Sequence, residues 1–290
     1  MSTQHSNHVV IVTDSSCDLP ASVADELGIV IVPLTIRFGE EEFVDREELS
    51  TAEFWSRCVN SSTLPETAAP APGQYEKVYR EAAANGASGV LVVSLSSALS
   101  ATMQSAQLAA RTIDADESIE LDVRVVDSRT ITMGLGTIAI ACARAARAGA
   151  GIDEIERLAH DLVERTRVFG ALDTLENLKK GGRIGNAKAM LATALSIKPI
   201  IEVTGGVVEQ GGKQRTRSKA LSYLVDKVTS YDGNIENLAV MHADCSDVDL
   251  FVELLAEHYP GEIVVGEIGP VIGTHGGRGT IGVAFQVTSA

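Results

Sequence analysis

The sequence is poor in aromatic residues and in positive charge. Both shortages limit the kinds of core and of binding partner that the protein can have. Phe, Trp and Tyr make up 4% of the 290 residues, so aliphatic side chains must supply most of any core. The 24 Lys and Arg residues are outnumbered by 39 Asp and Glu residues, which gives a formal charge of -15. Nucleic-acid-binding proteins normally carry a basic face and a high pI. We therefore expect no nucleic-acid partner.

Cysteine is also scarce. Cys17, Cys58, Cys142 and Cys245 lie far apart and form neither a C-x-x-C pair nor a zinc-type spacing. Four scattered cysteines in a chain of this length are typical of reduced cytosolic thiols. The histidines form no H-x-x-x-H or H-E-x-x-H pattern. The sequence therefore predicts no disulfide and no metal site.

Long apolar runs are missing as well. The predominantly apolar, uncharged run 130–143 covers about fourteen residues, whereas a membrane-spanning helix needs roughly 20. The first ten residues are polar and lack the apolar segment of a signal peptide. We expect a soluble, cytoplasmic protein with no stable membrane insertion.

The common nucleotide and hydrolase motifs are absent. No G-x-G-x-x-G follows the first apolar run, and no G-x-S-x-G occurs. The stretch 205–217 fails the phosphate-loop template, because Gly206 and Gly212 lie six positions apart instead of five and Gln214 follows Lys213. We therefore expect no ATP, NAD or other cofactor, and no catalytic residues.

Short β-branched runs alternate with longer helical patterns, which predicts an α/β fold. In the first half we expect strands at 8–14, 29–38, 89–96 and 123–128, and helices at 50–60, 73–85, 98–113 and 130–148. In the second half we expect helices at 152–166, 217–230 and 246–258, and strands at 167–172, 198–203, 237–243, 262–269 and 279–287. The pattern predicts two domains: 1–165 with a parallel sheet flanked by helices, and 166–290 with a mixed sheet.

Hydroxyl groups gather after one predicted buried strand, at Ser94, Ser96, Ser97, Ser100 and Thr102. In open α/β sheets, ligands lie beyond the carboxyl ends of strands, where helix N-termini offer unpaired N–H groups. These hydroxyls could surround an anion. The alternative is that one of them caps the next helix, which needs a single hydroxyl.

Two predicted loops hold further candidates. Thr67 lies in the Pro-rich loop 65–76, which could equally be a stiff surface loop. His275 lies in the Gly-rich loop 269–282, between Thr274 and Arg278. Glycines let the backbone approach a ligand closely, although a lone loop histidine is often only solvated.

Positive charge collects around Gly181 and Gly182 in the stretch "LKKGGRIGNAKAML" at 178–191. Lys179 and Lys180 could complement the C-terminal dipole of a short helix, but this leaves Arg183 and Lys188 unexplained. We predict that Arg183, helped by Lys180, Arg215 and Arg217, lies on a face shared with His275. There the cations would attract a phosphate or an acidic protein surface. The alternative is solvated charges on unrelated faces.

Together these segments resemble the DegV family of bacterial fatty-acid-binding proteins. The matching motifs run through nearly the whole chain: "VTDSSCDLP", "TAAPAPG", "SSALSAT", "VVDS", "LDTLENLKKGGRI", "IKPII", "KQRTRSKAL" and "IGTHGGRG". The order of these motifs and the element "Leu-Lys-x-Gly-Gly-Arg-Ile" are the most specific marks.

The resemblance implies a two-domain α/β carrier that sequesters one long-chain fatty acid. It implies presentation of the carboxylate to a separate ATP-dependent fatty acid kinase, which forms an acyl phosphate for phospholipid synthesis. The family's carboxylate-binding residues fall on Thr67, Ser100 and His275. We expect support from neighbouring hydroxyls, and a lipid tunnel in 166–290; the supporting residues would be Ser96, Ser97, Thr102 and Thr274.

The chain departs from the family pattern at three motifs. Ala68 and Ala69 replace the usual Ser-Gln, Ala101 replaces a glycine, and Arg278 replaces a proline. Arg278 adds a charge near the expected head group, where we predict a phosphate- or partner-docking role together with the cations above.

Two other functions compete with a carrier. A hydrolase would pair Ser100 with His275 and need Asp14 or Asp127 to orient the histidine. A regulatory or scaffold protein would hold no buried lipid. A long apolar tunnel favours the carrier, whereas Ser100 hydrogen-bonded to His275 favours the enzyme.

Overall fold

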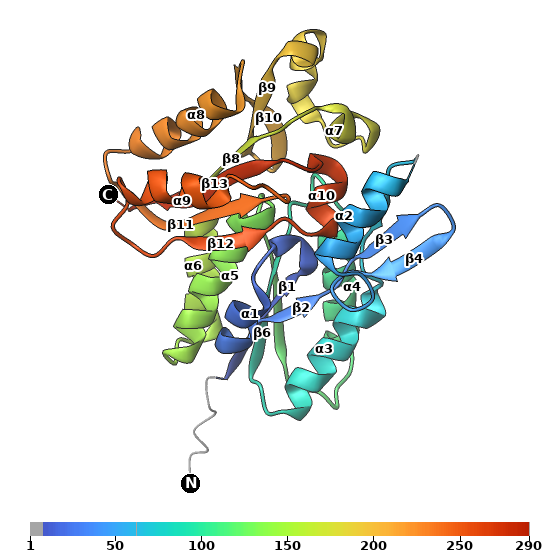
Figure 1. Ribbon diagram of the computed structural model, residues 1–290. Coiled ribbons are helices and arrows are strands. Elements are labelled where there is room, and N and C mark those ends of the chain that lie inside the picture. Colours follow the sequence, from blue (N-terminus) through green and yellow to red (C-terminus); the bar gives the residue numbers. More distant parts are fainter. Residues whose placement is uncertain (1–7, 62, 290) are drawn as a thin grey trace.

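A parallel four-stranded sheet forms the first half of the protein in the computed structural model, which describes residues 8–61 and 63–289 (Figure 1). The strand order is β2-β1-β6-β7, and every neighbouring pair is parallel. The strands are β1 (Val9–Asp14), β2 (Val30–Val32), β6 (Gly89–Ser94) and β7 (Asp122–Asp127). The central strand β6 is buried along its whole length, as expected where helices cover both faces of a parallel sheet.

Alternation of side chains along these strands gives each face its own core. Val12 and Val92 pack with α3 and α4, whereas Ile11 and Leu91 pack with α1, α5 and α6 on the other face. The helices are α1 (Ala21–Leu27), α3 (Pro72–Ala84), α4 (Thr102–Asp114), α5 (Thr132–Arg147) and α6 (Ile152–Arg165). The predicted β/α alternation of the first half is confirmed.

A mixed six-stranded sheet forms the second half, in the order β10-β9-β8-β13-β11-β12. Only β11 and β12 run parallel; the other neighbouring pairs are antiparallel. The strands are β8 (Thr166–Ala171), β9 (Lys198–Thr204), β10 (Val207–Gln214), β11 (Ile235–His242), β12 (Val264–Glu267) and β13 (Ile281–Val287). The predicted fold class, a parallel sheet followed by a mixed one, is therefore confirmed.

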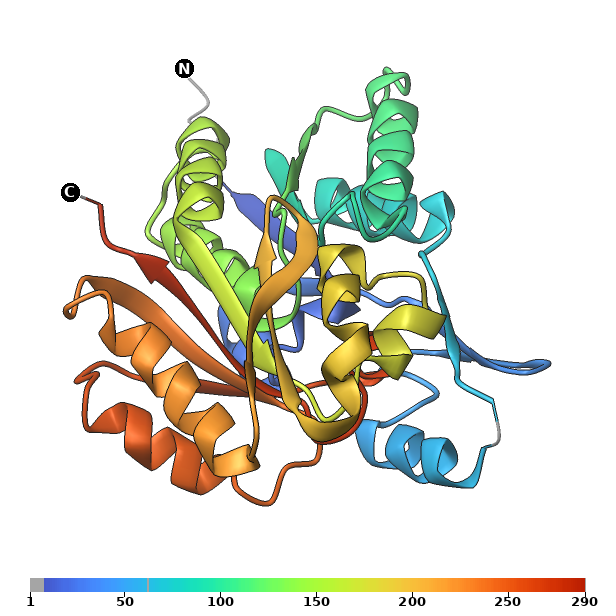
Figure 2. The ribbon, with the colours of Figure 1, turned by 90° about the horizontal axis from the view of Figure 1, so that it is seen from above.

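Helix α5 lies between the two sheets. The outer face of the six-stranded sheet is covered by α8 (Arg217–Thr229) and α9 (Val248–Ala256) (Figure 2). Its inner face packs on α5, which is buried on nearly all sides, as a helix between two sheets must be. The predicted division at 165/166 falls between α6 and β8. Both sheets share the core around α5, so separate domains stay a prediction.

The predicted strand 29–38 is wrong, because the chain changes sheets within it. Strand β2 ends at Val32, and Pro33 follows. A proline has no N–H to donate to a sheet ladder. The chain then enters a small antiparallel sheet of order β4-β3-β5, which the sequence analysis missed. Its strands are β3 (Thr35–Phe38), β4 (Glu41–Val44) and β5 (Glu66–Ala68), and α2 (Thr51–Asn60) lies between β4 and β5 in the chain.

Two predicted loops prove to be regular structure. Thr67 lies on β5, opposite Ile36 of β3, and not in an irregular loop. His275 lies on a short helix, α10 (Pro270–Gly276), although glycines surround it. Pro270 stands at the first turn of α10, where its missing N–H costs nothing. The remaining elements are η1 (Ser15–Cys17), α7 (Glu176–Lys180) and η2 (Gly185–Ser196).

Candidate functional site

A cavity of about 190 Å³ lies between the strand-end turns of the first half and the inner face of the six-stranded sheet. A single water needs only about 10–15 Å³ by the same measure, so this is more than a packing defect. Most of its wall is aliphatic: Leu34, Leu95, Leu99, Ile131, Val168, Leu172, Leu178, Ile201, Val203, Val208, Ile268, Val271 and Ile272, with Met241. Both halves of the chain contribute, so the predicted placement of a tunnel within 166–290 alone does not describe this cavity.

The polar end of the cavity is formed by side chains from three separate segments. Thr67 comes from β5, Ser100 from the turn between β6 and α4, and His275 from α10. Thr67 Oγ1 lies 3.2 Å from His275 Nε2, at hydrogen-bonding distance across 208 positions of sequence. The structure thus brings all three predicted carboxylate-binding residues to one cavity.

His275 is held in its neutral form. Burial, with a smaller contribution from the positive charge of Arg183, lowers the pKa of His275 to about 4. Its second ring nitrogen, Nδ1, is buried and has no hydrogen-bond partner among the described residues. A neutral imidazole with one unsatisfied nitrogen can still donate or accept one hydrogen bond.

Asp18, the residue after η1, holds the start of the helix that carries His275. Asp18 accepts a hydrogen bond from the Gly269 N–H at 2.9 Å, at the start of α10. Its other oxygen accepts from Thr132 Oγ1 at 2.6 Å, at the start of α5. Because Asp18 is buried, its pKa is raised to about 7. One carboxyl group therefore joins η1, α5 and α10.

The hydroxyl side chains between β6 and α4 form two groups with different partners. Ser100 Oγ lies on the cavity and 2.9 Å from Thr102 Oγ1, so Thr102 is its direct neighbour. Ser96 Oγ instead donates to the Gly206 carbonyl at 2.6 Å, and Ser97 Oγ donates to Asp127 at 2.5 Å. Ser96 and Ser97, predicted as supporting residues, thus hold the turn in place.

Thr274 is the fourth predicted supporting residue. Its hydroxyl donates to the Pro270 carbonyl within α10, at 2.8 Å. Its side chain thus bonds back to its own helix, and it is not among the residues that line the cavity.

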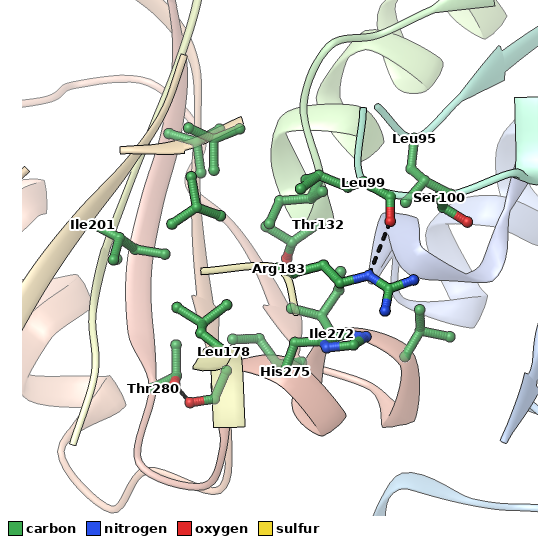
Figure 3. A pocket seen from close by; sticks show the side chains of 18 of the residues that line it. Leu95, Leu99, Ser100, Thr132, Leu178, Arg183, Ile201, Ile272, His275 and Thr280 are labelled. Atoms are coloured by element: carbon green, nitrogen blue, oxygen red, sulfur yellow. Dashed lines mark hydrogen bonds between the residues drawn. The ribbon is translucent and has the colours of Figure 1, made fainter. Parts of the chain in front are cut away.

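The glycine pair at 181–182 allows Arg183 and His275 to share the polar end. A Cβ on Gly181 would collide with His275 Nδ1, so only glycine leaves room for the imidazole. Gly182 has φ of +72°, a conformation that favours glycine. Arg183 then turns back, donating to the Gly181 carbonyl at 2.6 Å and to the Leu99 carbonyl at 3.2 Å. Figure 3 shows its guanidinium beside His275 and Ser100.

The other predicted docking cations lie in different settings. Lys180 and Arg215 are exposed and have no ion pair with any residue in the described parts of the chain. Arg217 is bound to Asp247 at 2.8 Å and donates to the Gly279 carbonyl. Arg278 is exposed and forms an ion pair with Asp244. Two of the five predicted cations are therefore already neutralised by acids.

The groups that a hydrolase needs are engaged elsewhere. Ser100 Oγ is hydrogen-bonded to Thr102 and not to His275, whose Nε2 is occupied by Thr67. Asp14 accepts from the Leu95 N–H and from Ser16, and Asp127 accepts from Ser97. Neither carboxylate orients the histidine, so the geometry favours binding over a serine-histidine mechanism.

The described residues also bear on metal binding and on membrane insertion. Within 8–61 and 63–289, no group of three or more His, Cys, Asp or Glu side chains is placed to hold a metal ion. None of the helices in that part of the chain is both long and apolar enough to cross a bilayer.

Sequence reasoning misses two polar residues of the cavity wall, Thr132 and Thr280. It places Arg183 beside His275, as the structure does, but on a docking face rather than in the wall. Thr132 and Thr280 line the cavity too, although their hydroxyls donate to Asp18 and to the Gly276 carbonyl. A threonine at the start of a helix usually suggests only a cap, so no sequence signal marks Thr132.

Fold and site together define a class: α/β proteins in which a parallel and a mixed sheet enclose an aliphatic cavity with one polar end. Within it, the chain belongs to the DegV family, whose model, described as "Uncharacterised protein, DegV family", matches residues 8–288. The resemblance that the motifs suggest is thereby confirmed.

Relatives and solved structures agree with this assignment. A DegV domain-containing protein of Streptomyces coelicolor is 36% identical over 97% of this chain and 99% of its own. A DegV family protein from Thermus thermophilus, described for its fatty acid binding, is 31% identical with a TM-score of 0.88, covering 97% of this chain and 99% of its own. A stearic acid-binding protein from Eubacterium ventriosum is 25% identical with a TM-score of 0.88, covering 96% and 97%.

Proposed function

We propose that this chain binds one long-chain fatty acid in the cavity, with the carboxylate against Thr67, Ser100 and His275. The observation that carries the proposal is a mostly aliphatic wall with Thr67, Ser100, His275 and Arg183 gathered at one end. Burying an alkyl chain gains roughly 0.8 kcal/mol per CH₂, so a C16 tail gains on the order of 10 kcal/mol before ordering costs. The relatives described as fatty-acid-binding support the same ligand class.

Removing the two hydroxyls tests the head-group assignment. A Thr67→Val and Ser100→Ala double variant should bind palmitate about 10- to 100-fold more weakly in a calorimetric titration, because each of the two hydrogen bonds contributes a net of about 1 kcal/mol. Thr112→Val with Ser118→Ala is the matched control, since these hydroxyls lie on the exposed surface. If the double variant keeps wild-type affinity and head-group position, the assignment is wrong.

We further propose that the bound carboxylate is presented to a separate, cytoplasmic, ATP-dependent fatty acid kinase, which forms an acyl phosphate for phospholipid synthesis. The chain then acts as a carrier, and the phosphoryl-transfer groups belong to the kinase. Lys180 at the end of α7 and Arg215 support this role, since both are exposed, lie outside the cavity wall and have no acidic partner among the described residues, so they can attract an acidic surface or a phosphate.

Charge reversal at Lys180 tests kinase docking better than a change at Arg183, because Arg183 lines the cavity and would alter lipid binding as well. Lys180→Glu should slow phosphorylation of bound palmitate at low salt and leave palmitate affinity unchanged. The difference should shrink as salt rises, since screening acts over about 10 Å at 0.1 M. Lys77→Glu on α3, at the far end of the molecule in Figure 1, is the control. Equal phosphorylation rates of both variants at low salt would refute the docking role.

A further inference from the structure

The six-stranded sheet forms part of the cavity wall. On two neighbouring strands of this wall a glycine leaves a gap without a side chain. Gly170 of β8 and Gly282 of β13 are direct cross-strand partners, and both line the cavity. The next residues in the same row, Ile201 on β9 and Met241 on β11, line it too. Neighbouring strands lie about 4.8 Å apart, so Ile201 and Met241 stand about 14 Å apart with no side chain of this row between them.

Side chains also border this gap in the direction of strand β8. Val168 and Leu172 face the cavity on either side of Gly170, because alternate residues of a strand share a face. A glycine inside a strand weakens the sheet and often marks a place where a ligand approaches the backbone. Here two such glycines meet on the central strands β8 and β13.

The two glycines are not equivalent. A Cβ on Gly282 would collide with the Phe169 carbonyl oxygen, so the packing of the backbone requires glycine there. The atoms nearest to a Cβ on Gly170 would be Ile201 Cγ1 at 3.5 Å, Leu172 Cδ1 at 3.7 Å and Ile201 Cδ1 at 3.9 Å, which are ordinary contacts. Gly170 also has no positive φ. The space beside Gly170 therefore belongs to the cavity and is not needed by the fold.

We propose that Gly170 determines the length of alkyl chain that the cavity accepts, by letting the chain lie directly against the backbone of β8. This inference rests on the proposed fatty-acid binding. Ser100 and the sheet residue Ile201 lie on opposite sides of the cavity in Figure 3. A side chain at position 170 would therefore meet the alkyl chain and leave the carboxylate in place.

Binding of saturated fatty acids from C12 to C18 to Gly170→Ala and Gly170→Val tests the inference. Valine adds three carbon atoms, which displace about two or three methylenes at about fourfold in affinity each. The C18-to-C12 affinity ratio should fall at least tenfold in Gly170→Val and less in Gly170→Ala. Neither variant should lose thermal stability, because both residues suit a strand better than glycine does.

Gly73→Ala is the matched control, since a Cβ there would meet nothing within 4 Å and α3 lies away from the cavity. It should keep the wild-type ratio. If the wild type binds fatty acids but both Gly170 variants keep its C18-to-C12 ratio, the inference is overturned and the proposed function stands. If the wild type binds no fatty acid of any length, both fail. A Gly170→Ala variant that does not fold would also overturn the inference, because the space beside Gly170 would then not be open.

Discussion

His275 is the residue whose proton should report on the bound ligand. Burial and Arg183 lower its pKa to about 4, so the ring of the ligand-free protein should stay neutral down to below pH 5. The unfolded chain takes up this proton near 6.5, so His275 contributes stability above pH 6.5 that is lost as the pH falls toward 4. A bound carboxylate should raise the pKa, because an opposite charge favours the protonated ring. Nitrogen-15 NMR titration of the ring would check this. A pKa near 6.5 without ligand would contradict it.

Gly181 should matter for binding rather than for folding. In Gly181→Ala, the new methyl group collides with the His275 ring and should push it away from Thr67. We expect palmitate affinity to fall about tenfold with little change in the melting temperature. Gly73→Ala, where the methyl group meets open space, serves as the control. Unchanged affinity in Gly181→Ala would show that the ring adjusts without loss.

The sequence predicts which residues form the site better than it predicts where their side chains point. The motifs single out Thr67, Ser100 and His275, and the structure brings them to one cavity. The charge of Arg183 is visible in the sequence, but its direction depends on the left-handed turn at Gly182 and on the carbonyl of Leu99. The latter contact joins residues 84 positions apart, so no local pattern contains it.

At the scale of elements, Asp18 links α10 to the body of the protein, and this link should depend on pH. Burial raises the Asp18 pKa from 3.8 to about 7, so the folded protein keeps a proton that the unfolded chain loses. Stability due to this group is therefore present at low pH and is lost as the pH rises from about 4 to 7. Asp18→Asn should remove this loss.

Urea unfolding from pH 4 to 8 tests the link at Asp18. The stability of Asp18→Asn relative to the wild type should rise with pH, by a few kcal/mol at most, and level off above about 7. Asparagine suits the comparison because it can still accept from the Gly269 N–H. A difference that stays constant with pH would show that Asp18 is ionised throughout, and a difference that falls with pH would contradict the assigned direction.

Helices and strands with a strong hydrophobic pattern are predictable from the sequence. Those that depend on partners far away in the chain are not. The buried strand β6 and helix α5 follow directly from their apolar runs. Strand β5 has three residues and exists because it pairs with β3, about thirty positions earlier in the chain. Helix α10 lies among glycines, and the N–H of Gly269, the residue before it, is held by Asp18 from the far end of the sequence.

At the scale of the whole molecule, the cavity arises because two sheets of different type face each other around α5. Strand ends of the parallel sheet supply the serine turn, and the inner face of the mixed sheet supplies the aliphatic wall. The sequence predicts both sheets but not their separation, because packing between distant elements sets it. None of the described residues that line the cavity is Phe, Trp or Tyr, in agreement with the 4% share of these residues in the chain.

Native mass spectrometry of the protein, purified gently from cells without detergent or added lipid, tests the central claim most directly. We expect a one-to-one adduct whose released ligand has the mass of a long-chain fatty acid. The adduct should be depleted in the Thr67→Val and Ser100→Ala double variant, since head-group hydrogen bonds add to the hydrophobic binding of the tail. Protein that carries no lipid, and takes up none when offered palmitate, would contradict the account.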